Sequence, residues 1–214
     1  MNIKEVKIKL TFLEPILGTA PKNKEVYSSY VQTKQIEKAS KTGIEVAQEM
    51  LDEELSTLPE NENGLEEKGW TTFHAIDGKP FIYDYLMTGF FKAACSVLRK
   101  DKSTQSAKVT AFNKVIDGMV FPSPRHLFLN IPEGEEMGVL ERPLRAQTPQ
   151  GERIALAKSD TCPAGTTIEV TLTIIGTTVT DKLLDEWLSY GRFRGLGQWR
   201  NAGFGKFSYE YLAE

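Results

Sequence analysis

The first residues of the chain alternate between apolar and polar side chains. Ile8, Leu10 and Phe12 fall on one side of this alternation, and the lysines between them, such as Lys7, fall on the other. A period of two is typical of a strand with one face buried and the other in water. The pattern therefore predicts a strand over residues 3–12, which ends shortly before the first proline and is followed by a polar loop.

Apolar residues recur at intervals of three and four in three later segments, as they do along one face of a helix. The first segment, residues 33–58, is followed by Pro59 and is rich in acidic residues. We therefore expect a helical insertion over about residues 31–69 with its charged face in solvent. The second segment covers residues 85–98, and the third is the short amphipathic segment 180–191.

Runs rich in β-branched and aromatic residues predict the remaining strands. Asp77-Gly78 is a hairpin turn signal between the first two of them. The expected strands are 70–76, a short one after Pro80, 115–121, 126–132, 166–175 and 204–212.

A basic segment over residues 142–160 lacks a clear period. Pro143, Pro149 and Gly151 argue against a regular element there, although a strand can begin near Glu152. A long irregular segment in a compact domain is often functional.

Strands and helices in this order indicate an α+β fold, with helices on one face of an antiparallel sheet. A βαββαβ ferredoxin-like (RRM-like) core with insertions accounts for the order, and we expect a single domain over residues 1–214.

The composition is that of an ordinary globular protein. The 214 residues carry a formal net charge of −3, so binding to nucleic acid must rest on a local basic patch. No apolar run is long enough to span a membrane, and the N-terminus lacks the apolar region of a signal peptide. Cys95 and Cys162 form neither a disulfide framework nor a metal set. We expect a cytoplasmic protein without metal or cofactor.

The stretch from Tyr190 to Phe207 combines glycines, basic residues and aromatic residues. It holds five glycines, four basic residues and no acidic residue. Glycine lets a backbone approach a ligand closely, while arginines and aromatic rings offer charge for phosphates and flat faces for bases. The alternative is a glycine-rich hairpin whose aromatic rings pack inward before the last strand.

Other candidate side chains stand alone. His74 has no partner at a recognisable spacing, so it is not a convincing general base. Lys92, in the expected helix 85–98, is a better candidate for a phosphate contact.

Four segments in order resemble the RAMP superfamily of CRISPR-associated proteins. The spacing G-x-G-x5-G-x-G before the last strand resembles its glycine-rich signature. GKPFIYDYLMTGFFKAACSVL, CPAGTTIEVTL and LLDEWLSYGRFRGLGQWRNAGFGKF resemble its strand-turn-helix segment, its Pro-Ala-Gly-Thr turn and its closing helix and loop. The matches cover residues 68–210, and the greatest likeness is to the guide-RNA-binding backbone subunit of type III effector complexes.

The resemblance implies an RNA-binding subunit of a ribonucleoprotein in antiviral defence. It also implies an extended β-hairpin thumb, supplied by the thumb-like segment at about residues 140–162. Its partners would be guide RNA or another single-stranded RNA, other copies of itself, and other effector subunits. The implied RNA-binding residues lie in the glycine stretch, the helix and the thumb: Lys92, Arg142, Arg145, Arg153, Arg192, Arg194, Gly195, Gly197, Trp199, Arg200, Gly203 and Gly205.

The resemblance does not extend to a catalytic set. Target-cleaving backbone subunits carry an aspartate in the loop after the first strand, and residues 15–35 contain none. Asp84 belongs to another loop, and neither His74 nor His126 matches the histidine of the related processing nucleases. We therefore expect binding without cleavage. The alternatives are a stand-alone mobile-element protein that binds another nucleotide or anion, and a structural assembly protein.

Overall fold

The computed structural model describes residues 1–23, 54–58, 69–148 and 151–213. The chain divides into two compact units. Unit 1 consists of Met1–Ile16, Phe81–Glu136 and Cys162–Glu214, and unit 2 consists of Leu17–Pro80 and Met137–Thr161. The expectation of a single domain stays a prediction.

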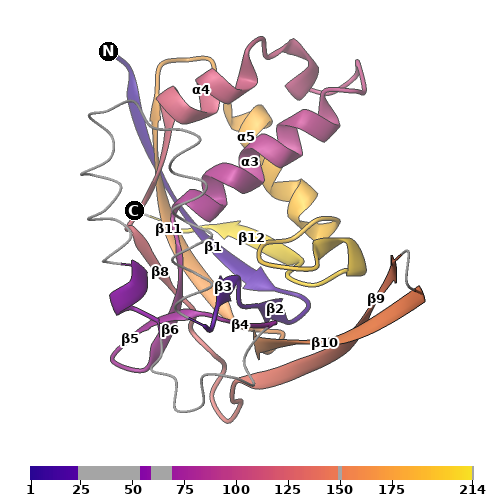
Figure 1. The fold of residues 1–214 in the computed structure, drawn as a ribbon. Helices are drawn as coiled ribbons and strands as arrows, with labels where there is room; N and C mark the ends of the chain where they lie inside the picture. The colour runs from indigo at the N-terminus through magenta and orange to yellow at the C-terminus, as the bar shows by residue number, and fades with distance from the viewer. Residues whose placement is uncertain (24–53, 59–68, 149–150, 214) are drawn as a thin grey trace, which may run out of the picture. The chain divides into compact units, whose positions relative to one another are not determined.

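Unit 1 holds the helices α3, α4 and α5 and a four-stranded sheet (Figure 1). Its elements are β1 (Ile3–Phe12), α3 (Tyr85–Leu98), η1 (Ser106–Lys108), α4 (Phe112–Met119), β7 (Val120–Ser123), β8 (His126–Phe128), β11 (Thr167–Ile175), α5 (Asp181–Ser189), η2 (Tyr190–Arg192), η3 (Arg200–Ala202) and β12 (Phe207–Tyr211). Two short strands, β2 (Ile16–Leu17) and β6 (Lys79–Tyr83), lie where the chain passes between the units.

The sheet of unit 1 has the strand order β12-β1-β11-β7, and all three pairings are antiparallel. Together with α3 and α5, these four strands follow each other along the chain as βαββαβ. This is the ferredoxin-like arrangement, in which the first and third strands are central. The predicted α+β ferredoxin-like fold is confirmed.

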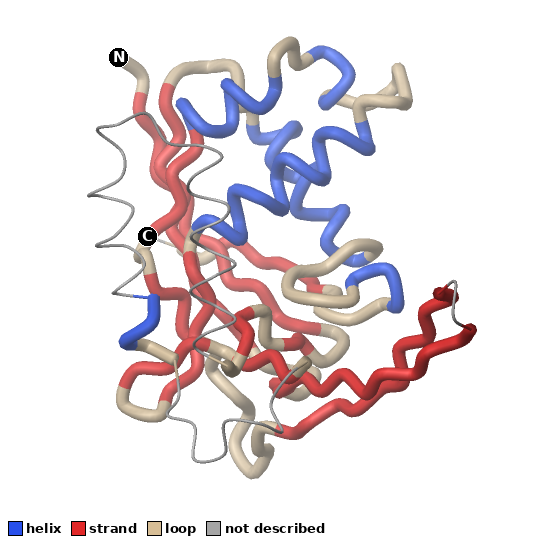
Figure 2. Tube along the Cα trace, in the orientation of Figure 1, coloured by secondary structure: helices blue, strands red, loops and turns tan. Residues whose placement is uncertain are grey.

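The two faces of this sheet differ in burial. Figure 2 shows α3, α4 and α5 gathered on one face, where side chains such as Leu10 and Leu172 are fully buried. Phe91 of α3 and Trp187 of α5 pack there with ring centroids 5.7 Å apart. The other face carries Lys7, Lys9 and other polar side chains and lies open, as expected for a one-sided antiparallel sheet. We call it the open face.

Unit 2 contains β3 (Ala20–Pro21), β4 (Trp70–Thr72), β5 (His74–Ile76), β9 (Gly138–Thr148) and β10 (Gly151–Cys162). Strands β9 and β10 form a long antiparallel hairpin, and β4 pairs with β10 in parallel. The indole of Trp70 donates a hydrogen bond of 2.7 Å to Asp160. The expected turn at Asp77-Gly78 joins β5 to β6, and both residues have positive φ.

Two predictions about secondary structure are wrong. Residues 115–121 were expected to form a strand, but α4 runs to Met119 and only the last two residues of the segment, Val120 and Phe121, belong to β7. Phe112, Val115, Ile116 and Met119 have the i, i+3, i+4, i+7 spacing of a helix face, and only Ile116 is fully buried. The β propensity of Val and Ile was the misleading signal.

The segment 142–160 is not irregular but lies within the hairpin of β9 and β10. Pro143 is tolerated because it stands in β9, which pairs only with β10 among the described strands. Most of the predicted helical insertion over 31–69 lies outside the described residues. So do Lys24, Tyr27 and Tyr30 of the polar loop after the first strand, whose side chains could contact a ligand. None of the helices in the described part of the chain is long and apolar enough to cross a membrane.

Candidate nucleic-acid interface

The glycine stretch forms a tight loop between α5 and β12 in unit 1. Its two ends touch through Gly195 and Gly205, whose backbones lie against each other. A Cβ at Gly195 would stand 1.8 Å from the carbonyl oxygen of Gly205, and one at Gly205 would stand 1.9 Å from that of Leu196. Only glycine fits at such an approach, and Gly205 also has a φ of +68°.

Backbone hydrogen bonds fix this crossing to the end of β1. Leu196 N–H donates to the Gly205 carbonyl at 3.0 Å, and Gly205 N–H donates to Pro15 at 2.9 Å. Leu13 N–H donates to the carbonyl of Lys206 at 2.7 Å. The loop is thus held by the core strand, and its tip, which contains Gly197 and Gly203, is presented from a fixed base.

Arg194 and Arg200 come together in this loop. Burial lowers the pKa of Arg200, and the positive charge of Arg194 lowers it further. The Nε of Arg194 is buried and has no hydrogen-bond partner within the described part of the chain. Among the residues that the structure describes, no carboxylate forms an ion pair with either guanidinium.

Two like charges that are partly buried and lack a counter-charge cost free energy. A bound anion that accepts hydrogen bonds from both guanidinium groups offsets this cost, and a phosphate suits the fork geometry of arginine. Lys206 lies elsewhere in the same loop, where its Nζ would stand 3.4 Å from a Cβ at Gly203. Arg192 is exposed in the turn that precedes them.

Aromatic rings accompany these charges. Trp199 stacks on Phe204 with centroids 5.4 Å apart and planes 7° from parallel. The Trp199 side chain is 42% exposed, and its backbone has a φ of +51°, which is uncommon for a bulky residue. Phe193 is still more exposed. The alternative, in which the rings of the stretch pack inward, therefore does not hold for Trp199 and Phe193, whereas Phe207 does pack into the core.

Lys92, the candidate on α3, is engaged within the protein. Its Nζ lies 2.5 Å from a carboxylate oxygen of Asp117 on α4. A phosphate at Lys92 would have to compete with this ion pair. This ion pair was not predicted from the sequence, because the segment that carries Asp117 was expected to be a strand.

The three arginines of the basic segment belong to unit 2. Arg142 and Arg145 stand three residues apart in β9, so they face opposite sides of the hairpin. Arg145 is exposed, while burial lowers the pKa of Arg142. The register places Arg153 of β10 opposite Ala146.

Sequence reasoning missed a cluster around the start of α3. Asp84 caps this helix by accepting a hydrogen bond of 2.8 Å from the N–H of Tyr85. Burial raises the pKa of the Asp84 carboxyl, and that N–H, Arg125 and His126 act against the rise. The guanidinium of Arg125 lies 5.1 Å from the ring centroid of Tyr83. No sequence spacing pointed to this cluster, because Asp84 and Arg125 are 41 positions apart.

His74, the other histidine, is buried and lies 2.9 Å from the hydroxyl of Thr57 in unit 2. Within the described ranges, no group of three or more His, Cys, Asp and Glu side chains is arranged so that it could hold a metal ion.

No protein-family model matches the sequence, and no curated protein matches it significantly. Solved structures do match. A chain in the cryo-EM structure of the Type III-B Cmr-beta bound to cognate target RNA has a TM-score of 0.53 and 12% identity, over 99% of this chain and 59% of that one. This chain thus spans less than two thirds of its neighbour.

Two further structures are similar with lower scores. A chain of a Type IV-B CRISPR complex has a TM-score of 0.46 and 12% identity, over 98% of this chain and 91% of that one. Cmr6 from Pyrococcus furiosus has a TM-score of 0.44 and 10% identity, over 97% and 99%. The fold that the resemblance implies is therefore shared with a chain of the Cmr-beta structure.

Proposed function

We propose that this chain is an RNA-binding subunit of a CRISPR-type ribonucleoprotein that holds single-stranded RNA, such as a guide, at its glycine loop. The observation that carries the proposal is the pair Arg194 and Arg200, partly buried together with no counter-charge among the described residues. The shared fold supports it, since the similar structure was solved with target RNA bound.

The geometry of the loop suits a nucleic-acid strand better than a lone anion. The guanidinium groups can hold phosphates, and the exposed ring of Trp199, supported from behind by Phe204, offers a face to a base. Neither contact reads a sequence, so we expect binding that tolerates different bases. Arg145 and the rest of the hairpin are a second candidate for RNA contacts, and other subunits or other copies of the chain would share the RNA.

We further propose that the chain binds RNA without cleaving it. The sequence of the loop, residues 190–207, contains cations and rings but no aspartate, glutamate, histidine or cysteine. The Asp84 carboxyl caps a helix through its hydrogen bond to Tyr85.

The test is a double variant, Arg194→Ala with Arg200→Ala. Each lost phosphate contact reduces the slope of log K against log salt by about 0.7 for single strands, so the slope should become shallower by about 1.4. Affinity for a mixed-sequence RNA of about 20 nucleotides should fall at every salt concentration. Fluorescence anisotropy at several salt concentrations measures both quantities.

The matched control is Lys100→Ala with Lys102→Ala, which also removes two positive charges. Both lysines are exposed after α3, so the control should leave the salt slope nearly unchanged. Equal effects of the two double variants would mean that only general charge matters and would remove the glycine loop from the interface.

A further inference from the structure

The sheet of unit 1 has a gap on its open face. β11 pairs with β7 from Thr171, which lies opposite Ser123. On the same side, the next described backbone pairing of β11 is at Thr167, which forms a bridge with Asn130. Three residues of β11 thus lie opposite the six residues 124–129. The longer segment leaves β11, and its part β8 pairs with β6 instead.

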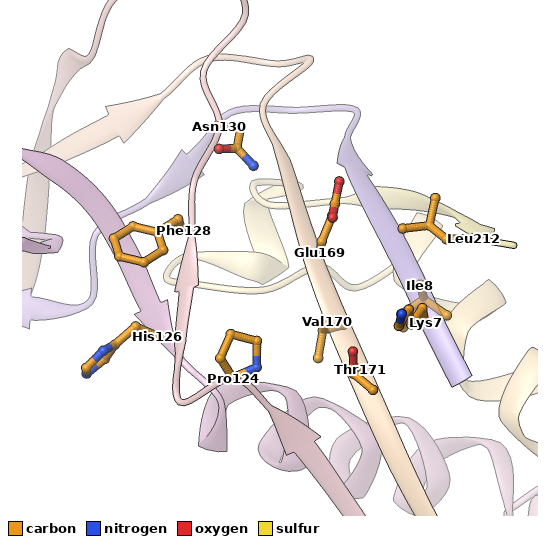
Figure 3. A pocket seen from close by; sticks show the side chains of 10 residues that line it. All are labelled: Lys7, Ile8, Pro124, His126, Phe128, Asn130, Glu169, Val170, Thr171 and Leu212. Atoms are coloured by element: carbon orange, nitrogen blue, oxygen red, sulfur yellow. The ribbon is translucent and has the colours of Figure 1, made fainter. Parts of the chain in front are cut away.

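A trough of about 490 Å³ opens at this gap, a size typical of small-ligand sites (Figure 3). β8 and its flanks line one side, and β11 and β1 line the other. The lining residues used below are Lys7, His126, Phe128, Asn130, Glu169 and Thr171.

The aromatic side of the trough is rigidly supported. Phe128 is 37% exposed, while Phe81 behind it is fully buried. The ring of Phe81 lies 5.8 Å from that of Phe128 and 4.5 Å from that of His126. Rings held in this way form a preorganised stacking face, which loses little entropy when a flat ligand binds.

The other lining residues of the trough include hydrogen-bond donors and acceptors. Asn130 is fixed by two backbone hydrogen bonds of 2.9 Å with Thr167, and its amide can both donate and accept. Glu169 supplies a carboxylate that accepts from amino groups, and Thr171 supplies a hydroxyl. Aromatic faces together with amide and carboxylate groups are how proteins stack on a base and read its edge.

The charges exclude a run of phosphates at this place. Lys7 is the one cation among the residues named above, apart from the titratable His126, and Glu169 opposes it. A polyanionic backbone would meet no net positive charge here, in contrast to the glycine loop. A single base is compatible with this balance, and Lys7 can contact one phosphate attached to it.

We propose that the trough binds one nucleobase that carries an exocyclic amino group, stacked on Phe128 with its amino group donating to Glu169. The base can belong to a free nucleotide or to an RNA strand. Only the second source rests on the function proposed above.

The first experiment titrates CMP and UMP into the full-length, nuclease-treated protein by isothermal calorimetry. These nucleotides differ at the base edge, where CMP has an amino group and UMP has an oxygen. We expect CMP to bind about tenfold more tightly, within the range for one good base contact. Phe128→Ala should weaken CMP binding by about tenfold, as expected for a lost stack. Glu169→Gln should abolish the preference, because a glutamine amide can donate to UMP.

Two substitutions on the same open face are matched controls. Phe121→Ala removes an exposed ring of β7, and Glu5→Gln removes a carboxylate of β1; neither residue lines the trough. Both should leave CMP binding unchanged, and thermal melts of all four variants check that they fold. Equal affinity for CMP and UMP, or equal effects of Phe128→Ala and Phe121→Ala, would overturn the proposal. No nucleotide binding would also overturn it and would leave the trough to a polypeptide.

Photo-crosslinking then separates the two sources of the base. 8-azido-AMP and an RNA with one 8-azidoadenosine are irradiated with the protein, and mass spectrometry locates the attached peptide. Attachment near Phe128 from the RNA identifies the strand as a source, and attachment from the free nucleotide alone identifies a nucleotide site. Attachment from neither contradicts the proposal. The Arg194→Ala, Arg200→Ala variant should lose only the RNA crosslink, so failure of the loop and failure of the trough remain distinguishable.

Discussion

The space around a glycine determines whether a larger residue can replace it. At Gly195 the obstacle is backbone, since the nearest atoms to an added Cβ are the carbonyl oxygen and carbon of Gly205 and the nitrogen of Lys206. Backbone atoms held by hydrogen bonds cannot turn aside as a flexible side chain can. Gly89 in α3 is the opposite case, because an added Cβ there would meet nothing within 4 Å.

We therefore predict opposite effects of the same substitution at these two glycines. Gly195→Ala should lower the free energy of unfolding by about 1–3 kcal/mol, as overpacking does. Gly89→Ala should raise it by about 0.5–1 kcal/mol, because alanine favours a helix interior. Urea denaturation measures both. A neutral Gly195→Ala would show that the crossing of the loop ends opens easily.

At the scale of elements, the sequence predicted what local patterns determine. β1, α3 and α5 were found because each has a regular period and one buried face, and β11 was found through its run of β-branched residues. The strand over 115–121 was wrong because β-branched residues also fill a helix face, and contacts such as that of Lys92 with Asp117 favour the helix. The proposed interface was found in part, through the composition of the glycine stretch. The trough was missed because the departure of β8 from β11 depends on long-range pairing, which no local pattern contains.

The N-terminal cap of α3 makes stability depend on pH in a way that can be tested. The pKa of Asp84 is raised above its ordinary value of 3.8, mainly by burial. As the pH rises above 3.8, Asp84 ionises in the unfolded chain before it ionises in the folded protein. The free energy of unfolding therefore falls until the pH passes the folded pKa, and above that pH the loss is complete. Asp84→Asn keeps a capping side chain and removes this cost. The variant should therefore gain stability relative to wild type between pH 3 and pH 7.

Asp101 provides the reverse comparison. Hydrogen bonds from the backbone and side chain of Ser103 lower its pKa below 3.8. Its ionised form therefore stabilises the fold at neutral pH, and this contribution is lost as the pH falls through the folded pKa. Asp101→Asn should lose stability relative to wild type between pH 3 and pH 7. Thermal melts at both pH values measure the two trends, and trends of the same sign would contradict the assignment.

At the scale of the whole molecule, the charge is unevenly distributed along the chain. The net charge is −3, yet the glycine loop holds four basic residues and no acidic one. Copies of such a chain repel one another weakly through their net charge. RNA bound at the loops of successive copies would bring them together, because one strand can occupy several sites at once.

We therefore predict that assembly of this protein depends on RNA. After nuclease treatment, size-exclusion chromatography with light scattering should give a molar mass that does not increase with the concentration of the RNA-free protein. Adding a single-stranded RNA of about 40 nucleotides should shift the protein to higher mass, with more copies on longer strands. The Arg194→Ala, Arg200→Ala variant should lose the shift, while Lys100→Ala with Lys102→Ala should keep it. Filaments or rings in RNA-free protein would instead favour a structural assembly protein, because contacts between the chains would then suffice without the strand.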